Sequence, residues 1–134
     1  MYNRNSYFDQ YFKQILESDE TEHYYFYTMS FASLTKYLLF QSAAPLFNKH
    51  MIVCVTNKRI LVFEMDPTTG KLTENAAGIS LSDVKHLSIK KGLLKTKVKI
   101  TFADDSAMQF SPNNFCIGLS NHKKNLIKLT AMYA

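Results

Sequence analysis

The stretch from residue 51 to residue 63 constrains the fold more than any other. Two apolar runs, 51–55 and 60–63, flank the polar sequence Thr56-Asn57-Lys58-Arg59. Apolar runs of this length bounded by turn residues, and rich in Val and Ile, are typical of buried strands. A short polar linker between them suits a hairpin, with Asn57 tolerating the left-handed backbone that a two-residue loop needs. We therefore predict an antiparallel strand pair.

Two of the turn residues, Lys58 and Arg59, are basic, so the turn is also a candidate site for binding an anionic ligand. We favour a structural role. Arg59 begins the second strand and is expected to pair with Asp66, Glu64 or a backbone carbonyl. Direct ligand contact is the alternative.

More short strands are expected after this hairpin. The sequence 66–70 has a proline and a closing glycine and is a second turn. Strands are predicted at 79–81, 84–90, 95–102 and 108–110, and an earlier aromatic strand at 23–31. The segment 32–49 fits either a short helix or an irregular strand and loop.

Amphipathic helices are expected at both ends of the chain. From 5 to 17, apolar residues recur at helical spacing and form a broad stripe; they are Tyr7, Phe8, Tyr11, Phe12, Ile15 and Leu16. Ser120 is the expected N-cap of the last helix. Its apolar side is predicted from Leu126, Ile127 and Leu129, with Met132 or Tyr133.

Composition limits the class of protein. With 134 residues, 46% of them apolar, the chain has the size and core of one domain that needs no metal or disulfide. Cys54 and Cys116 stand at no motif spacing, so we expect free thiols in a reducing cytoplasm. The N-terminus lacks the apolar region of a signal peptide, and no apolar run approaches the ~18 residues that span a bilayer. These features predict a soluble, cytoplasmic protein.

Four segments of the middle region resemble bacterial PH-like domains, in particular the YokE-like group. They are the hairpin 53–63, the step ISLSDVKHL at 79–87, the turn KKGLL at 90–94 and the strand VKITF at 98–102. The GRAM branch of the PH superfamily has a similar hairpin. The resemblance implies an α+β, mainly β fold: a PH-like barrel of two orthogonal antiparallel sheets with a C-terminal capping helix. We assign 1–19 to an additional N-terminal amphipathic helix and 20–134 to the PH-like domain.

The resemblance also implies a binding function, because PH-superfamily members often bind phosphoinositides or proteins. Their phosphoinositide signature is a basic cluster in the loop between the first two strands. That loop is expected within 32–49, where the only basic residues are Lys36 and Lys49. Inositol-phosphate recognition of that kind is therefore disfavoured.

A lysine-rich segment is the stronger candidate site. No acidic residue lies between Asp83 and Asp104, whereas this segment holds Lys85, Lys90, Lys91, Lys95, Lys97 and Lys99. Alternation places the last three on one strand face, and a hairpin would bring Lys90 and Lys91 to its tip. Such a face can attract anionic lipid headgroups or another polyanion. The alternative is a solvated face whose lysines prevent edge aggregation.

Nothing in the sequence predicts catalysis. The histidines, His23, His50, His86 and His122, lack metal-ligand spacing, neither cysteine has an activating basic motif, and no GxGxxG or GxxxxGK is present. We predict a non-enzymatic protein without a metal, a cofactor or a small-molecule substrate.

The leading functional prediction is a scaffold module for protein–protein association, including self-association. The stripe around Tyr7, Phe8, Tyr11 and Phe12 offers more apolar surface than one small barrel obviously needs, and we assign these residues to partner binding. The first alternative is a peripheral membrane module that uses Lys90, Lys91, Lys95, Lys97 and Lys99. The second is a β-barrel that binds single-stranded nucleic acid.

Overall fold

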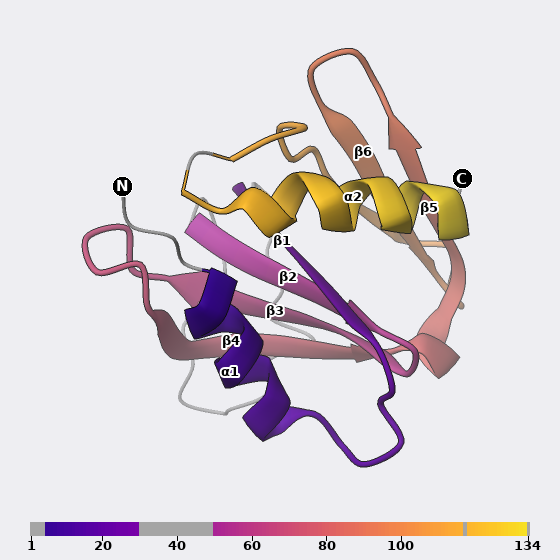
Figure 1. The fold of residues 1–134 in the computed structure, drawn as a ribbon. Helices are drawn as coiled ribbons and strands as arrows, with labels where there is room; N and C mark the ends of the chain where they lie inside the picture. The colour runs from indigo at the N-terminus through magenta and orange to yellow at the C-terminus, as the bar shows by residue number, and fades with distance from the viewer. Residues whose placement is uncertain (1–4, 30–49, 117, 134) are drawn as a thin grey trace.

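Two antiparallel sheets and two helices make up the described part of the protein (Figure 1). The computed structural model describes residues 5–29, 50–116 and 118–133. The first sheet has the order β1-β2-β3-β4 and the second β5-β6-β7. In chain order the elements are α1 (Asn5–Ile15), β1 (His23–Met29), β2 (His50–Thr56), β3 (Arg59–Met65), β4 (Leu72–Ser80), the short 3-10 helix η2 (Leu81–Asp83), β5 (Val84–Lys91), β6 (Thr96–Phe102), β7 (Ala107–Phe110) and α2 (Ser120–Tyr133).

The first sheet is covered on both faces. Alternate residues of β2 point to opposite sides, so Val53 and Val55 join one cluster of buried side chains, and Ile52 and Cys54 another. The second cluster is closed by α1, whose Phe8 and Phe12 rings are fully buried there. This double burial explains why 51–55 is continuously apolar instead of alternating.

The other face of the first sheet packs against the second sheet. Val98 and Ile100 of β6 are buried in this core, and α2 adds Leu126 and Leu129. Strands β5 and β6 run across the direction of β1 to β4, and α2 lies along the opening between the sheets (Figure 1). The expected mainly β architecture with a C-terminal capping helix is confirmed.

The N-terminal ends of the two helices are bound to one another. Asn5 Nδ2 donates to Ser120 Oγ over 2.6 Å, and the Asn121 backbone N–H donates to Asn5 Oδ1 over 3.1 Å. The Asn5 side chain therefore satisfies one of the free N–H groups at the start of α2, a capping role that the sequence assigned to Ser120. The Tyr25 hydroxyl lies between them, accepting from Asn121 Nδ2 and donating to the Asn5 carbonyl.

Four sequence predictions need correction. Strand β4 runs from Leu72 to Ser80, although only 79–81 is expected from the sequence, because pairing with β3 overrides its weak β-formers Asn, Ala and Gly. Helix α1 ends at Ile15, not near residue 17, because the chain turns there and the Glu17 N–H donates to the Glu20 carboxylate.

Asn57 does not adopt the expected left-handed backbone; Asp105 is the non-glycine residue with positive φ in the described ranges. Ile127 is 47% exposed, not part of the packed side of α2. The prediction for 32–49, and the end of the strand expected at 23–31, lie outside the described residues.

Candidate anionic-surface site

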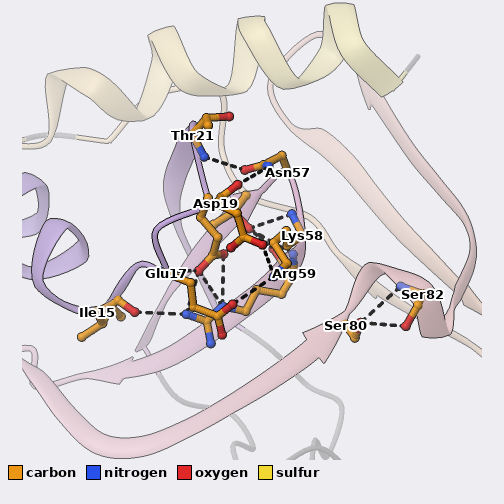
Figure 2. Close-up of polar contacts among 11 residues, drawn as sticks. Ile15, Glu17, Asp19, Thr21, Asn57, Lys58, Arg59, Ser80 and Ser82 are labelled. Carbon is orange, nitrogen blue, oxygen red and sulfur yellow. Dashed lines mark hydrogen bonds and ion pairs between the residues drawn. The ribbon is translucent and has the colours of Figure 1, made fainter.

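The turn between β2 and β3 is a structural junction (Figure 2). Thr56 Oγ1 accepts the N–H groups of Lys58 and Arg59, each over 3.0 Å, which closes the turn without a left-handed residue. Asn57 reaches across to the chain after α1: its Oδ1 accepts the Thr21 N–H, and its Nδ2 donates to the Asp19 carbonyl. The side chains of this turn thus hold the α1–β1 connection in place.

A buried ion pair lies at the centre of this junction. Arg59 Nη2 is 2.9 Å from Glu20 Oε1, and the Glu20 side chain is fully buried. Thr56 Oγ1 also donates to Glu20 Oε2 over 2.5 Å. Burial alone would raise the pKa of Glu20, but the hydrogen bonds from Arg59, the Glu17 N–H and Thr56 outweigh it and lower the pKa. Arg59 also donates to the Ile15 carbonyl, so its predicted structural role is supported, with Glu20 as the ion-pair partner that the sequence did not indicate.

Lys58 is likewise occupied by internal partners. Its Nζ lies 2.7 Å from Asp19 Oδ2 and 3.0 Å from Glu17 Oε2. The hydrogen bond from Lys58 lowers the pKa of Asp19, and the bonds to Asp19 and Glu17 raise the pKa of Lys58. These contacts favour a structural role for the turn over a role in ligand binding.

The β5–β6 hairpin carries four exposed lysines on its outer face. Lys90 of β5 is directly opposite Lys97 of β6 in the ladder. Lys99 follows two residues later on the same face, opposite Ser88 and Gln109, and Lys95 precedes Lys97 by the same step. All four are exposed. We call Lys90, Lys95, Lys97 and Lys99 the lysine face.

The other two predicted lysines lie elsewhere. Lys91 is opposite the buried Thr96, so it points to the face that looks toward α2, where it lines a small hollow together with Lys123. Lys85 lies at the far end of β5 and pairs with Asp105, Nζ to Oδ1 2.6 Å. Within the described ranges, no carboxylate forms an ion pair with a member of the lysine face. Like charges directly opposite one another in a sheet are destabilising, and Lys90 and Lys97 are such a pair.

Two leucines at the tip of the same hairpin are largely exposed to solvent. Leu93 is 93% exposed and Leu94 is 74% exposed. The hairpin reaches past α2, and its tip lies at the top of the view in Figure 1. The sequence pattern predicts only a turn here. A signal was present, because Leu-Leu stands where turns usually hold Gly, Pro, Asn, Asp or Ser.

One side chain holds the backbone of the tip. Asn114 Nδ2 donates to the carbonyls of Gly92 and Leu93, over 3.0 and 3.2 Å, and its N–H donates to the Leu94 carbonyl over 2.9 Å. Its Oδ1 in turn accepts from Thr96 Oγ1. The Gly92 N–H donates to the Lys95 carbonyl across the turn. The carbonyls of the tip and the Gly92 N–H are thus hydrogen-bonded within the protein.

The N-terminal apolar stripe belongs to the core. Phe8 and Phe12 are fully buried against the first sheet, so these two rings are not available as the partner-binding surface that the sequence suggested. Tyr7 and Tyr11 are half-buried; the Tyr7 hydroxyl accepts the Leu72 N–H, and the Tyr11 ring packs edge-on against Phe63.

The histidine and cysteine side chains His122 and Cys54 have structural surroundings. His122 is buried, accepting the Tyr27 N–H at Nδ1 over 2.9 Å, with Nε2 2.6 Å from the Asn113 carbonyl. Cys54 is a buried free thiol, and burial raises its pKa, which disfavours the reactive thiolate. Cys116 is half-buried. In the described part of the chain, no group of three His, Cys, Asp or Glu residues is placed to hold a metal ion.

The fold defines a PH-like module: two antiparallel sheets closed by a C-terminal helix. The chain belongs to the bacterial PH domain family, whose model matches residues 16–128. PH-like domains are in general binding or scaffold modules and not catalysts. None of the helices within the described ranges has the length and apolar character needed to cross a bilayer.

Comparison with curated proteins gave no match to this sequence. Among solved structures, the hSac2 domain from the human phosphoinositide phosphatase Sac2 is similar, with 12% sequence identity and a TM-score of 0.48. The similarity covers 95% of this chain and 76% of that one. A likeness of this degree carries no argument about ligand or partner.

Proposed function

We propose that this protein is a non-enzymatic peripheral membrane module that binds anionic lipid through the lysine face. The observation that carries the proposal is the direct opposition of Lys90 and Lys97 in the β5–β6 ladder. This arrangement costs stability in the free protein. An anionic surface laid against the hairpin would relieve that repulsion and be attracted by all four lysines.

The expected strength fits reversible binding. Each lysine near an anionic membrane surface contributes about 1 kcal/mol. The four members of the lysine face therefore supply roughly 4 kcal/mol, a Kd near the millimolar range if nothing else contributes. Such binding is screened by salt, because the Debye length at physiological ionic strength is only about 8 Å.

The alternatives have less support. Proteins that bind single-stranded nucleic acid stack bases on aromatic side chains, and no aromatic residue stands among the lysines of 85–99. Protein association through the N-terminal stripe is weakened because Phe8 and Phe12 are used in the core.

A vesicle co-sedimentation assay tests the proposal. We expect binding to vesicles of phosphatidylcholine with phosphatidylglycerol, not to phosphatidylcholine alone, and we expect the triple variant Lys95→Glu, Lys97→Glu, Lys99→Glu to lose it. The new carboxylate at position 97 would face Lys90 as a favourable cross-strand pair, so the variant should fold; far-UV circular dichroism checks this.

A matched control changes the same amount of charge elsewhere. Lys13 on α1, Lys71 before β4 and Lys124 on α2 are exposed, and replacing all three by Glu should reduce binding far less. Equal loss in the two triple variants would refute a site at the lysine face. Salt-dependent retention on an oligonucleotide, with no vesicle binding, would favour the nucleic-acid alternative instead.

A further inference from the structure

We infer that the tip of the β5–β6 hairpin, Leu93 and Leu94, inserts into the apolar layer of the bilayer while the lysine face binds the headgroups. The inference rests on the proposed function and deepens it: the ligand is a lipid bilayer surface, recognised by charge and by insertion together. The hairpin would then act as a membrane anchor of two chemically different parts.

The exposure and position of the two leucines carry the inference. Single exposed apolar residues are common on protein surfaces and need no explanation. Here two adjacent leucines, 93% and 74% exposed, stand at the end of a projecting hairpin. Lys95 follows Leu94 directly, and Lys91 lies two residues before Leu93. An apolar tip bordered by cations matches the chemistry of an anionic membrane, whose headgroups lie just above its hydrocarbon.

The carbonyl groups of the tip are hydrogen-bonded within the protein. Backbone N–H and C=O groups that enter lipid without a partner each cost several kcal/mol in general, which bars most loops from insertion. In this tip the carbonyls of Gly92, Leu93 and Leu94 all accept from Asn114, and the Gly92 N–H donates to Lys95. The side chains of the leucines can therefore leave water without stranding the carbonyls beneath them.

The turn that presents the leucines is also fixed in shape. A Cβ atom at Gly92 would lie 2.8 Å from the Lys95 carbonyl oxygen, closer than real Cβ contacts. Glycine at this position lets the two arms approach, and the isolated bridge between Lys95 and Asn113 extends the pairing beside it. Little ordering cost is left for the moment of binding, which favours affinity.

The absence of tryptophan from the sequence gives a direct test. Leu94→Trp places a single fluorophore at the tip, and Thr68→Trp, in the exposed turn between β3 and β4, is the matched control. On adding vesicles that contain phosphatidylglycerol, we expect a blue shift and quenching by brominated acyl chains for the tip variant, and neither for the control.

A second variant measures the contribution of the leucines. Leu93→Ser with Leu94→Ser changes only exposed side chains, so the fold should be kept. We expect vesicle affinity to fall at least about tenfold, since full burial of one leucine is worth more than that. The remaining binding should be lost at moderate salt, whereas the unchanged protein should retain part of its binding.

The outcomes separate this inference from the proposed function. Insertion is refuted if vesicle binding depends on the lysines but the tip tryptophan shows no blue shift. It is also refuted if the double serine variant binds vesicles as tightly as the unchanged protein. Either result leaves binding by the lysine face unaffected. A complete lack of vesicle binding by the unchanged protein overturns both. A blue shift on neutral and anionic vesicles alike would retain insertion but refute the role of the lysines.

Discussion

Replacing Arg59 by Met tests how the β2–β3 turn is held. The change removes a guanidinium whose Nε lies 3.1 Å from each oxygen of Glu20 and whose Nη2 lies 2.9 Å from Oε1. The Glu20 carboxylate, fully buried, then keeps the hydrogen bonds donated by its other neighbours in the junction, the Glu17 N–H at 2.9 Å and the Thr56 hydroxyl at 2.5 Å. Removing one partner of a buried ion pair costs about 3–5 kcal/mol. Since two donors remain, we expect the low end of that range, about 3 kcal/mol.

That loss is large for a domain of this size. The free energy of unfolding of such domains is about 5–15 kcal/mol. With an unfolding entropy near 2.1 cal/mol/K per residue, 134 residues give about 0.28 kcal/mol/K, so Tm should fall by about 10 °C. Urea denaturation followed by far-UV circular dichroism measures the change.

A second substitution makes the reasoning refutable. Glu20→Gln removes the buried charge and leaves Arg59, whose side chain is 24% exposed and can reach water, so it should cost only about 1–2 kcal/mol. The double variant should be more stable than Arg59→Met alone, because no uncompensated charge is left inside.

The pH dependence of stability gives a further check. Because the native pKa of Glu20 is lowered, the contribution of Glu20 to the free energy of unfolding is present above about pH 4.5 and is lost as the pH falls. A cost below about 1 kcal/mol for Arg59→Met, or a double variant that is simply the sum of both, would contradict this account.

Two further predictions concern buried titratable groups. Burial lowers the pKa of His122, although its hydrogen bond to the Asn113 carbonyl opposes this, so the unfolded chain takes up a proton that the native state does not. The free energy of unfolding should therefore be at its full value above about pH 6.5 and should decrease as the pH falls below that. In His122→Gln, the denaturation midpoint should change less between about pH 7 and 5. The change that remains is due to His23, whose pKa burial also lowers. For Cys54, burial raises the thiol pKa, and we expect a thiol reagent at about pH 8 to modify it only after unfolding, with Cys54→Ser leaving the native reaction unchanged. Fast modification of Cys54 in the native protein would contradict its buried position.

The sequence predicted those parts of the fold whose pattern is local. The β2–β3 hairpin is marked by its two apolar runs, and β6 by strict alternation in KTKVKITF. Strand β4 was mostly missed, because LTENAAGIS is a poor strand by propensity and is held by its ladder with β3. Tertiary pairing decided where local preference was weak.

The candidate site was predictable in charge but not in shape. The lysines of 85–99 are evident in the sequence, yet only the register shows that Lys90 and Lys97 stand opposite one another and that Lys91 turns the other way. The Glu20–Arg59 pair joins residues 39 positions apart, and no local pattern indicates it. The support of the tip by Asn114 depends in the same way on a contact between distant segments.

The attachment of α1 has a practical consequence for anyone who trims this protein. Family matching begins at residue 16, after the helix that supplies Phe8, Phe12 and Asn5. A recombinant fragment that begins at residue 16 would expose the apolar face of β2 and β3 that α1 covers, and α2 would lose its cap from Asn5. We expect such a fragment to aggregate, so the boundaries of the family match are a poor guide for choosing the ends of a fragment.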